Sequence, residues 1–260
     1  MRITQAAETL VPYLREVVSN ESTARLVLEE WKGQKRGHIR IGSGPSASSH
    51  LLPPLLKQYH ARFPLVDVYL ECTVEPEALL AKVSGGALDL ALLMYVSLPE
   101  QPNVVDHIAW QSPMVLVANR EGVPARCKLS DLRQQPFILF QKNSMMDTLV
   151  SGYFASLAFR PRIIIRSDSG DAVLSLARQG LGIAILPLWC VEEDAQRGRL
   201  RILGQREKRL TISLALFGRK SAFLPPAVRG LVQLASTFPW VHLEAISTSK
   251  PPGALSFPSL

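Results

Sequence analysis

The sequence predicts an α/β protein built from two similar lobes, with a long helix in front of them. Two stretches share one design, in which an apolar helix ends at glycine and a short strand follows at once: VSGGALDLALL at 83–93 and LARQGLGIAILP at 176–187. Glycine adopts the left-handed conformation that ends a helix, and the aliphatic run after it is too short for another helix. Because this design occurs in both halves of the chain, we expect one copy in each lobe.

The first 33 residues predict a long helix that pairs with a second chain. Apolar or small residues recur in alternating steps of four and three, interrupted only at Glu21, which is the spacing of a coiled-coil seam. The stripe begins at Ile3 and Ala7 and continues through the residues that we expect to form a dimer contact, Leu10, Leu14, Val17, Ala24, Leu28 and Trp31. We expect a kink near Pro12. The alternative is that the stripe packs against the chain's own globular body.

The first lobe is expected to comprise residues 37–115 and 214–242. Its strands are expected at 38–41, 66–72, 88–93 and 114–118, and its helices at 49–62, 76–84 and 225–238. Residues 94–112 show little periodicity, so no element is expected there. Strands that alternate with helices predict a mainly parallel sheet with helices on both faces.

The second lobe is expected at residues 116–213 and repeats the alternation. Its strands are expected at 137–140, 162–166 and 183–187, and its helices at 145–157 and 171–179. The chain then runs through a basic segment to a strand expected at 211–217, where the second lobe ends. Residues 243–260 are expected to form a disordered tail, because the segment around Lys250, Pro251 and Gly253 offers too little apolar periodicity to pack.

The composition is that of a globular protein, with 47% apolar and 20% charged residues among 260. No apolar run approaches the roughly 18 residues that a membrane helix needs, and Glu8 and Glu16 stand where a signal peptide would be apolar. We therefore expect a cytoplasmic protein without membrane contact. The three cysteines, an odd number without a C-x-x-C pair, are expected to be small buried residues rather than a redox pair.

The formal charge of +7 is concentrated between Arg197 and Lys220, where eight basic residues stand against one acid, Glu207. The rest of the chain therefore sums to zero, which excludes a uniformly basic nucleic-acid binder. The cluster suits phosphate or an acidic partner, but a solvated surface beside the strand at 211–217 is the favoured interpretation.

A glycine-rich turn, GSGPSA at 42–47, joins the first strand to the first helix and matches the G-x-G-x-x-G/A fingerprint of dinucleotide-binding enzymes. In that fingerprint the glycines approach a pyrophosphate and an acid holds a ribose hydroxyl. Here the acid, Glu71, lies too far along the chain, and Pro45 removes an amide from the turn. We favour a simpler use, in which hydroxyls and free amides at the helix start, those of Ser43 and Ser46 among them, hold a small anion or carboxylate.

The corresponding turn of the second lobe, QKNS at 141–144, is equally polar. Both turns follow the carboxyl end of a strand, so they face each other if the lobes form a cleft. For any single serine or asparagine in these turns, helix N-capping alone is the favoured interpretation.

Patterns typical of catalysis or metal binding are absent from the sequence. The five histidines are scattered, with no H-E-x-x-H motif and no cysteine partners at metal spacing. The sequence also has no G-x-S-x-G nucleophile motif and no phosphate-binding P-loop. We therefore expect neither an enzyme nor a bound metal or cofactor.

Taken in order, several short stretches resemble the LysR-type transcriptional regulators, in particular their linker helix and effector-binding domain. The resemblance covers residues 1 to about 240 and rests on RITQAAETLVPY at 2–13, GHIRIG at 37–42, LLP at 51–53, FP at 63–64, glycine 86 with LDLA at 88–91, QGLGI at 179–183 and LP at 186–187. It implies a two-lobed fold similar to the type 2 periplasmic solute-binding proteins, with a small effector held between the lobes.

By position, the resemblance implies an effector site lined by Ser43, Pro45, Ser46, Met94, Phe140, Gln141, Ser144 and Pro187. The serines and Gln141 suit a carboxylate or a hydroxylated molecule, whereas Met94 and Phe140 suit an aromatic one. The resemblance also implies a homodimer or tetramer, in which effector binding shifts the population of lobe arrangements and so modulates DNA binding and transcription.

The DNA-reading helices of the family precede the equivalent of Met1, so we expect contact with DNA only through an N-terminal domain that is missing from this chain. The main alternative is a stand-alone solute-binding protein of the same fold, which needs an export signal and has no use for the heptad helix. The dinucleotide-binding enzyme is a less favoured alternative.

Overall fold

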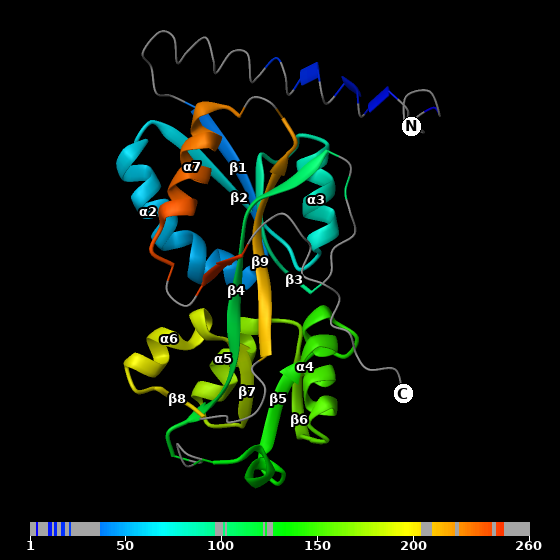
Figure 1. Cartoon of the computed structure of the whole chain (residues 1–260), viewed down its shortest axis with the longest axis vertical. Helices are drawn as coiled ribbons and strands as arrows, with labels where there is room; N and C mark the ends of the chain where they lie inside the picture. Colours follow the sequence, from blue (N-terminus) through cyan, green and yellow to red (C-terminus); the bar gives the residue numbers. More distant parts are fainter. Residues whose placement is uncertain are drawn as a thin grey trace. The chain divides into compact units, whose positions relative to one another are not determined.

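The computed structural model describes residues 37–96, 101, 103–121, 123, 127–203, 210–221, 224–240 and 243–246, together with residues 4, 10, 11, 13, 14, 17, 18 and 21. It is mixed α/β, as the sequence predicts, and divides into two compact units whose elements are labelled in Figure 1. Unit 1 consists of Met1–Ala109, Leu214–Pro239 and Ala245–Leu260, and unit 2 consists of Trp110–Ser213 and Trp240–Glu244. The sequence-based lobes instead place the first crossing after residue 115.

The strands of unit 1 are β1 (Gly37–Ser43), β2 (Val66–Cys72), β3 (Leu90–Tyr95) and parts of β4 (Val104–Asn119) and β9 (Leu210–Arg219). Its helices are the π-helix η1 (Ala47–Leu51), α2 (Leu52–Arg62), α3 (Pro76–Ser84) and α7 (Pro226–Thr237). The strand order is β2-β1-β3-β9-β4, and β1 pairs in parallel with both β2 and β3. A parallel strand covered on both faces is mostly apolar, and Ile39, Ile41 and Leu90 are accordingly fully buried.

Helices cover both faces of these strands. Helices α2 and α7 lie together on one face, and α3 lies on the other (Figure 1). The hydroxyl of Tyr59 on α2 donates a hydrogen bond of 2.8 Å to the carbonyl oxygen of Ala227 on α7. On the other face, Leu80 and Val83 of α3 pack on Leu93 of β3. Unit 1 is therefore a three-layer arrangement with its core on both sides of β1 and β3.

An ion pair fixes the point where β3 begins. The guanidinium of Arg40 donates to both carboxylate oxygens of Asp89, over 2.9 Å to Oδ1 and 3.2 Å to Oδ2. The backbone amide of Arg40 also donates to Oδ2 over 2.7 Å, and the amide of Asp89 donates back to the carbonyl oxygen of Arg40 over 2.8 Å. The acid that leads into the aliphatic run of β3 therefore sets the register of β3 on β1.

Strand β4 is longer than the sequence predicts, since the expected strand covered only 114–118. Polar residues such as Asp106 and His107 interrupt its apolar alternation and hide the first half of the strand from pattern analysis. The imidazole of His107 packs against Gly218 of β9, where an added Cβ atom has no room. Among the described residues its Nε2 has no hydrogen-bond partner, and burial lowers the pKa of His107, an effect that the charge of Asp106 opposes.

Unit 2 contains the second part of β4, the start of β9, the short helix η2 (Leu129–Leu132), strands β5 (Pro136–Phe140), β6 (Arg162–Ser167), β7 (Ile183–Pro187) and β8 (Leu200–Ile202), and helices α4 (Met145–Ser156), α5 (Gly170–Arg178) and α6 (Leu188–Gln196). Strand β5 lies between β6 and β7 and is parallel to both, whereas β7 and β8 are antiparallel to β4. Helix α4 lies on one side of these strands, and α5 and α6 lie on the other (Figure 1).

The core of unit 2 contains an aromatic cluster under α4. Phe137 of β5 is fully buried, and its ring meets those of Phe154 and Phe159 edge-on, with centroid distances of 5.8 Å and 5.6 Å. Edge-to-face contacts of this kind add stabilisation beyond the burial of apolar area. Phe154 lies on α4 and Phe159 on the segment that leads to β6, so the cluster joins three consecutive elements.

A buried carboxylate joins α5, α6 and the segment before β8. Asp194 is 1% exposed and accepts hydrogen bonds from Nε of Arg178, over 2.7 Å, and from Nε of Arg199. Burial raises the pKa of Asp194, but the hydrogen bonds and charges of both arginines lower it by more than burial raises it. The pKa of Asp194 therefore lies below its ordinary value. Asp194 is therefore ionised at neutral pH, and part of the basic segment after Arg197 serves packing within unit 2.

Helix α6, strand β8 and strand β10 (Glu244–Ile246) were not predicted. Strands of three residues carry too little pattern to detect, and both β8 and β10 gain their hydrogen bonds by pairing with β4. The prediction of disorder over 243–260 is wrong for Glu244–Ile246, and residues 247–260 lie outside the described residues. Cys190 is buried as expected, but Cys72 is exposed at the end of β2.

Only part of the predicted N-terminal helix falls among the described residues. Those from Leu10 to Glu21 that are described are helical, and the side chains of Leu10, Leu14 and Val17 are more than half exposed. Ala24, Leu28 and Trp31 lie outside the described residues. Among the described helices, none combines the length and the apolar character needed to cross a membrane.

The glycine pair after α5 performs two different tasks. Gly180 has a φ of +77°, the left-handed conformation that ends the helix, as the sequence predicts. Gly182 lies where an added Cβ would be 2.7 Å from the carbonyl oxygen of Pro136 on β5. The close approach of β7 to β5 therefore requires glycine at this position.

We expect Gly182→Ala to lower the free energy of unfolding by about 1–3 kcal/mol, because the backbone of β5 has to move away from the new methyl group. Chemical denaturation of the purified chain measures this. Gly85→Ala is the matched control, since its Cβ would meet only the carbonyl oxygen of Ala81 at an ordinary 3.4 Å. An equal loss of stability in both variants would contradict the close-approach explanation.

Candidate functional site

The carboxyl end of β1 forms a polar turn in unit 1. Ser43, the last residue of β1, is 1% exposed, and its hydroxyl is hydrogen-bonded to that of Ser48. Its carbonyl oxygen accepts a hydrogen bond of 3.2 Å from the amide of Thr73, which follows β2. The buried hydroxyl of Ser43 is therefore satisfied inside the turn and holds Ser48 in place.

The turn continues into a π-helix rather than an α-helix. Residues Ala47–Leu51 form η1, and the amide of Ser48 donates to the carbonyl oxygen of Gly44 over 3.0 Å. Ser46, at the N-cap position, is 8% exposed, and its side chain makes no capping hydrogen bond. Short π-helical segments occur frequently at functional sites. The hydroxyl of Ser46 is consequently not used to cap the helix.

Met94 belongs to the same edge of unit 1. The parallel register pairs Ser43 of β1 with Leu92 of β3, so Met94 follows two residues later, at the carboxyl end of β3. Its side chain is half-buried. The predicted residues Ser43, Pro45, Ser46 and Met94 thus form one group at the carboxyl edge of unit 1.

Unit 2 has a second polar turn at the carboxyl end of β5, at residues 141–144. The amide of Gln141 donates over 2.8 Å to the carbonyl oxygen of Ser167, and the amide of Ser144 donates over 3.1 Å to the carbonyl oxygen of Gln141. Asn143 has a φ of +67°, a conformation that costs energy in any residue with a side chain, although asparagine tolerates it best. Ser144 caps α4, since its Oγ accepts the amide of Asp147 over 3.1 Å.

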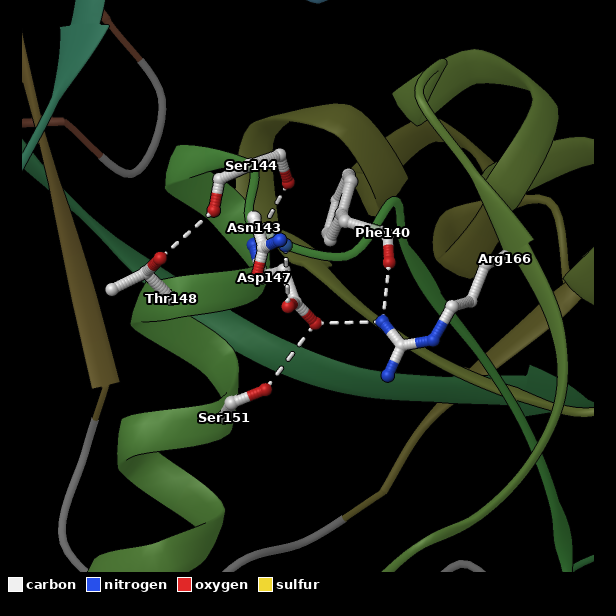
Figure 2. A network of polar contacts seen from close by, with 7 residues as sticks. All are labelled: Phe140, Asn143, Ser144, Asp147, Thr148, Ser151 and Arg166. Atoms are coloured by element: carbon white, nitrogen blue, oxygen red, sulfur yellow. Dashed lines mark hydrogen bonds and ion pairs between the residues drawn. The ribbon is translucent and has the colours of Figure 1, made fainter.

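Asp147 and Arg166 lie beneath this turn and connect its two ends (Figure 2). Nη1 of Arg166 donates over 2.7 Å to Oδ1 of Asp147 and over 2.7 Å to the carbonyl oxygen of Phe140. The other carboxylate oxygen of Asp147 accepts the amide of Asn143 over 3.1 Å, and Oδ1 also accepts the hydroxyl of Ser151 over 3.3 Å. The network therefore joins the end of β5, the turn, the start of α4 and the end of β6.

The charge of Asp147 is stabilised by these contacts. Asp147 is 8% exposed, and burial raises the pKa of its carboxyl group. The hydrogen bonds from Arg166, Asn143 and Ser151, together with the charge of Arg166, lower the pKa by more than burial raises it. The pKa of Asp147 therefore lies below the ordinary 3.8. Asp147 is therefore ionised at neutral pH and at the same time compensated by Arg166.

The remaining predicted residues of unit 2 share this edge. Phe140 is buried at the end of β5, Gln141 is exposed, and Ser144 is half-buried. Pro187 is buried at the end of β7, the strand that pairs in parallel with β5. The eight residues predicted from the sequence thus fall into two groups, one at the carboxyl edge of each unit.

Sequence reasoning missed the residues that hold both turns. Ser48 lies inside a helix, and Asp147 and Arg166 are separated by a whole helix and loop, so no local spacing points to their contact. The signal that was present is the Ser144-x-x-Asp147 spacing of a helix N-terminus. That signal predicts a cap, but it does not predict the arginine that compensates the charge.

The described residues contain no group of three or more histidine, cysteine or acidic side chains that would hold a metal ion. Glu71, the acid that a dinucleotide site would use for the ribose, forms an ion pair with Lys82 instead. A surface cavity of about 560 Å³ lies in unit 2 between Ser151, Phe154, Phe159 and Ile163, and none of the predicted site residues lines it.

Fold and edges together define a ligand-binding α/β domain of two units. The chain belongs to the family described as the LysR substrate binding domain, whose model matches residues 32–238. It is therefore an effector-binding domain of the LysR family of transcriptional regulators.

Two relatives illustrate the similarity. The chain is 24% identical over 203 residues to an HTH-type transcriptional regulator of Bacillus subtilis, YwqM, covering 77% of this chain and 69% of that protein. It is 25% identical over 220 residues to OxyR of Escherichia coli, a DNA-binding transcriptional dual regulator, covering 81% of this chain and 70% of that protein.

Solved structures share the fold. The effector-binding domain of QuiR in complex with shikimate has a TM-score of 0.60 at 17% identity, over 77% of this chain and 95% of that domain. Full-length OxyR from Pseudomonas aeruginosa has a TM-score of 0.69 at 18% identity, over 91% of this chain and 77% of that one. CbnR in complex with its target DNA has a TM-score of 0.64 at 18% identity, over 91% of this chain and 82% of that one. The two-lobed, type 2 periplasmic-binding-protein-like fold that the resemblance implied is confirmed.

We expect the stabilising effect of the Asp147 charge to depend on pH. Because its pKa is lowered in the folded state, the contribution is complete at neutral pH and is lost as the pH falls below about 4. Asp147→Asn should therefore be less stable than the unmodified chain at pH 7, with the difference shrinking toward pH 3. Urea unfolding across this pH range measures it.

Asp168→Asn, which removes an exposed carboxylate near the same edge, is the control for the loss of one negative charge. A stability difference for Asp147→Asn that stays constant from pH 7 to pH 3 would contradict the assignment of a compensated carboxylate.

Proposed function

We propose that this chain senses a small metabolite and associates with further copies of itself, as the regulatory part of a LysR-type transcriptional regulator. The observation that carries this proposal is the family match over residues 32–238, which spans elements of both units. Regulators such as YwqM and OxyR are transcription factors, and we propose that this chain likewise has no catalytic role, needs no cofactor and acts in the cytoplasm.

We propose that the residues that bind the effector are those at the carboxyl edges of the two units, Ser43, Pro45, Ser46, Met94, Phe140, Gln141, Ser144 and Pro187. Ligands of α/β proteins bind at the carboxyl ends of parallel strands, and each unit carries a polar turn in that position. Ser46 supports the proposal because its buried hydroxyl makes no capping bond. The exposed side chain of Gln141 supports it from unit 2.

The effector that suits these residues is a hydroxylated or aromatic carboxylate. Hydroxyls and helix-start amides bind carboxylate oxygens, while Met94 and Phe140 supply apolar contact. The structures of two relatives show small acidic ligands to be compatible with the fold, since QuiR is in complex with shikimate and CcmR of Synechocystis is in complex with 2-PG.

In the mechanism we propose, the effector stabilises one arrangement of the two units. A ligand shifts such an equilibrium only by as much as it binds one arrangement better than the other. This preference is transmitted to the subunits of a dimer or tetramer, joined through the heptad stripe that includes Leu10, Leu14 and Val17, and through them to promoter DNA. CbnR shows a full-length LysR regulator on its target DNA.

Two alternatives lose support. The stand-alone solute-binding protein shares the fold, but the relatives that cover most of this chain are regulators. The dinucleotide-binding enzyme requires a free acid after β2, and Glu71 is occupied by Lys82.

We expect a thermal-shift screen of small hydroxylated and aromatic carboxylates to find a compound that raises the melting temperature, because a ligand that binds only the folded state stabilises it. Calorimetry with that compound should show about tenfold weaker binding to Ser46→Ala, which removes one hydroxyl from the site. Ser236→Ala on α7, whose hydroxyl bonds to the carbonyl oxygen of Gln233, is the control. Equal affinity of Ser46→Ala and the unmodified chain would contradict the proposed site.

We expect light scattering to give the molar mass of a dimer or a larger assembly. Removal of residues 1–32 should lower the number of chains in each particle. A single Leu14→Asp substitution should weaken the assembly in the same direction, because a charge in a coiled-coil seam is buried on pairing. Glu21→Lys, at the position that already interrupts the stripe, is the control. A monomer with and without residues 1–32 would instead favour the solute-binding protein.

A further inference from the structure

The contacts that shape the turn at 141–144 meet at one side chain. We propose that Arg166 is a positioning residue for the effector site: it sets the conformation of this turn before the ligand arrives. The functional meaning of this inference rests on the proposed function, because the turn carries Gln141 and Ser144. The structural part rests on the described contacts alone.

The geometry of Arg166 is specific to this task. Both hydrogens of a single nitrogen, Nη1, are used, one toward the carbonyl oxygen of Phe140 and one toward Oδ1 of Asp147, each over 2.7 Å. Phe140 immediately precedes the turn, and Asp147 belongs to the first turn of α4, which follows it. One nitrogen therefore holds the two sides of the turn at a fixed separation (Figure 2).

Asp147 transmits this constraint to the backbone of the turn itself. Its Oδ2 accepts the amide of Asn143 over 3.1 Å, and that residue is the one with the left-handed backbone. A bond from an amide to a charged carboxylate is about twice as strong as a neutral one. The charge on Asp147 is needed to offset the cost of the left-handed conformation, and Arg166 is needed to keep that charge in a site that is 8% exposed.

The position of Arg166 separates this role from general support of the fold. Its side chain is 33% exposed, and its bonds end on the turn and the start of α4. The aromatic cluster of Phe137, Phe154 and Phe159 lies at the start of β5 and the end of α4, and neither of the two bonds of the guanidinium ends on it. Loss of Arg166 should therefore loosen the turn while the core of unit 2 stays folded.

A fixed turn matters for binding because a ligand that orders a mobile loop loses affinity to the entropy of ordering. With Arg166 in place, the amides and side chains of residues 141–144 are already arranged when the effector arrives. Compensation of Asp147 has a second effect: an acidic effector does not meet an unpaired negative charge below the turn.

The test is amide hydrogen exchange of the full chain, followed by NMR at Asn143, with the amides of β7 as the internal reference. We expect Arg166→Gln to speed exchange at Asn143 by about tenfold or more, while exchange in β7 stays within about twofold of the unmodified chain. Arg166→Lys, which keeps the charge but not the planar fork, should restore part of the protection. Arg162→Gln, an exposed arginine on the same strand, is the control and should leave Asn143 unchanged.

A second readout is the titration of the Asp147 carboxyl group, followed by its carbon resonance. Arg166→Gln should raise its pKa, and Arg166→Lys should return it part of the way, because the lysine charge still favours the carboxylate. If Arg166→Gln does not fold, Arg166→Lys alone tests the proposal. Lysine lacks the planar guanidinium, so this variant should still speed hydrogen exchange at Asn143 by a few-fold.

Unchanged exchange at Asn143 in Arg166→Gln would overturn the proposal, and so would equal acceleration at Asn143 and throughout β7, which is the result of a purely structural role. None of these measurements uses a ligand. A failed metabolite screen would therefore count against the proposed function and leave the role of Arg166 intact, whereas the exchange result decides that role by itself.

Discussion

Each interior strand of this protein has to satisfy its backbone on two sides while helices cover both of its faces. Strand β1 meets the requirement between β2 and β3, and β5 meets it between β6 and β7. Such strands admit few polar side chains, and the aliphatic runs of β3 and β7 are nearly uniform. Arg40 on β1 is an exception, and its guanidinium is paired with Asp89. Helical crossovers return the chain to the amino end of the next strand, and polar residues collect where the strands stop. The position of both polar turns therefore follows from the demands of the backbone.

The two units keep similar turns in place by different chemistry. In unit 1 a pair of hydroxyls, on Ser43 and Ser48, joins the end of β1 to a π-helix, without any charge. In unit 2 an ionised Asp147 is buried beneath the turn and compensated by Arg166. The hydroxyl pair carries no charge, whereas the ion pair makes the turn of unit 2 sensitive to acid. The polar turns of the two units thus respond differently to solution conditions.

Periodicity and glycine positions predicted most of the fold because the elements concerned are buried on regular faces. The helix end at Gly180 and the strand after it follow from the local pattern, as does the run of β3 after Asp89. The first half of β4 could not be predicted, since Asp106 and His107 conceal a strand whose partners come from distant parts of the chain. The same holds for the site: Ser43 and Gln141 are found by their place after a strand, but the contact between Asp147 and Arg166 exists only in three dimensions. A contact between residues that are far apart in the sequence produces no local spacing pattern, so sequence patterns do not predict it.

Unit 1 is assembled from pieces of chain that lie on both sides of unit 2 in the sequence, and this determines the order in which a growing polypeptide becomes whole. When the ribosome has released residues up to Ser213, strands β5, β6 and β7 and their helices are all present, whereas unit 1 still lacks β9 and α7. Most of unit 2 is thus synthesised before unit 1 is complete, and β3 has one side of its backbone unpaired until β9 follows. An aliphatic strand with a bare edge is the kind of surface that drives aggregation. The edge of β3 therefore stays open during synthesis until the chain has been extended to Arg219, the end of β9.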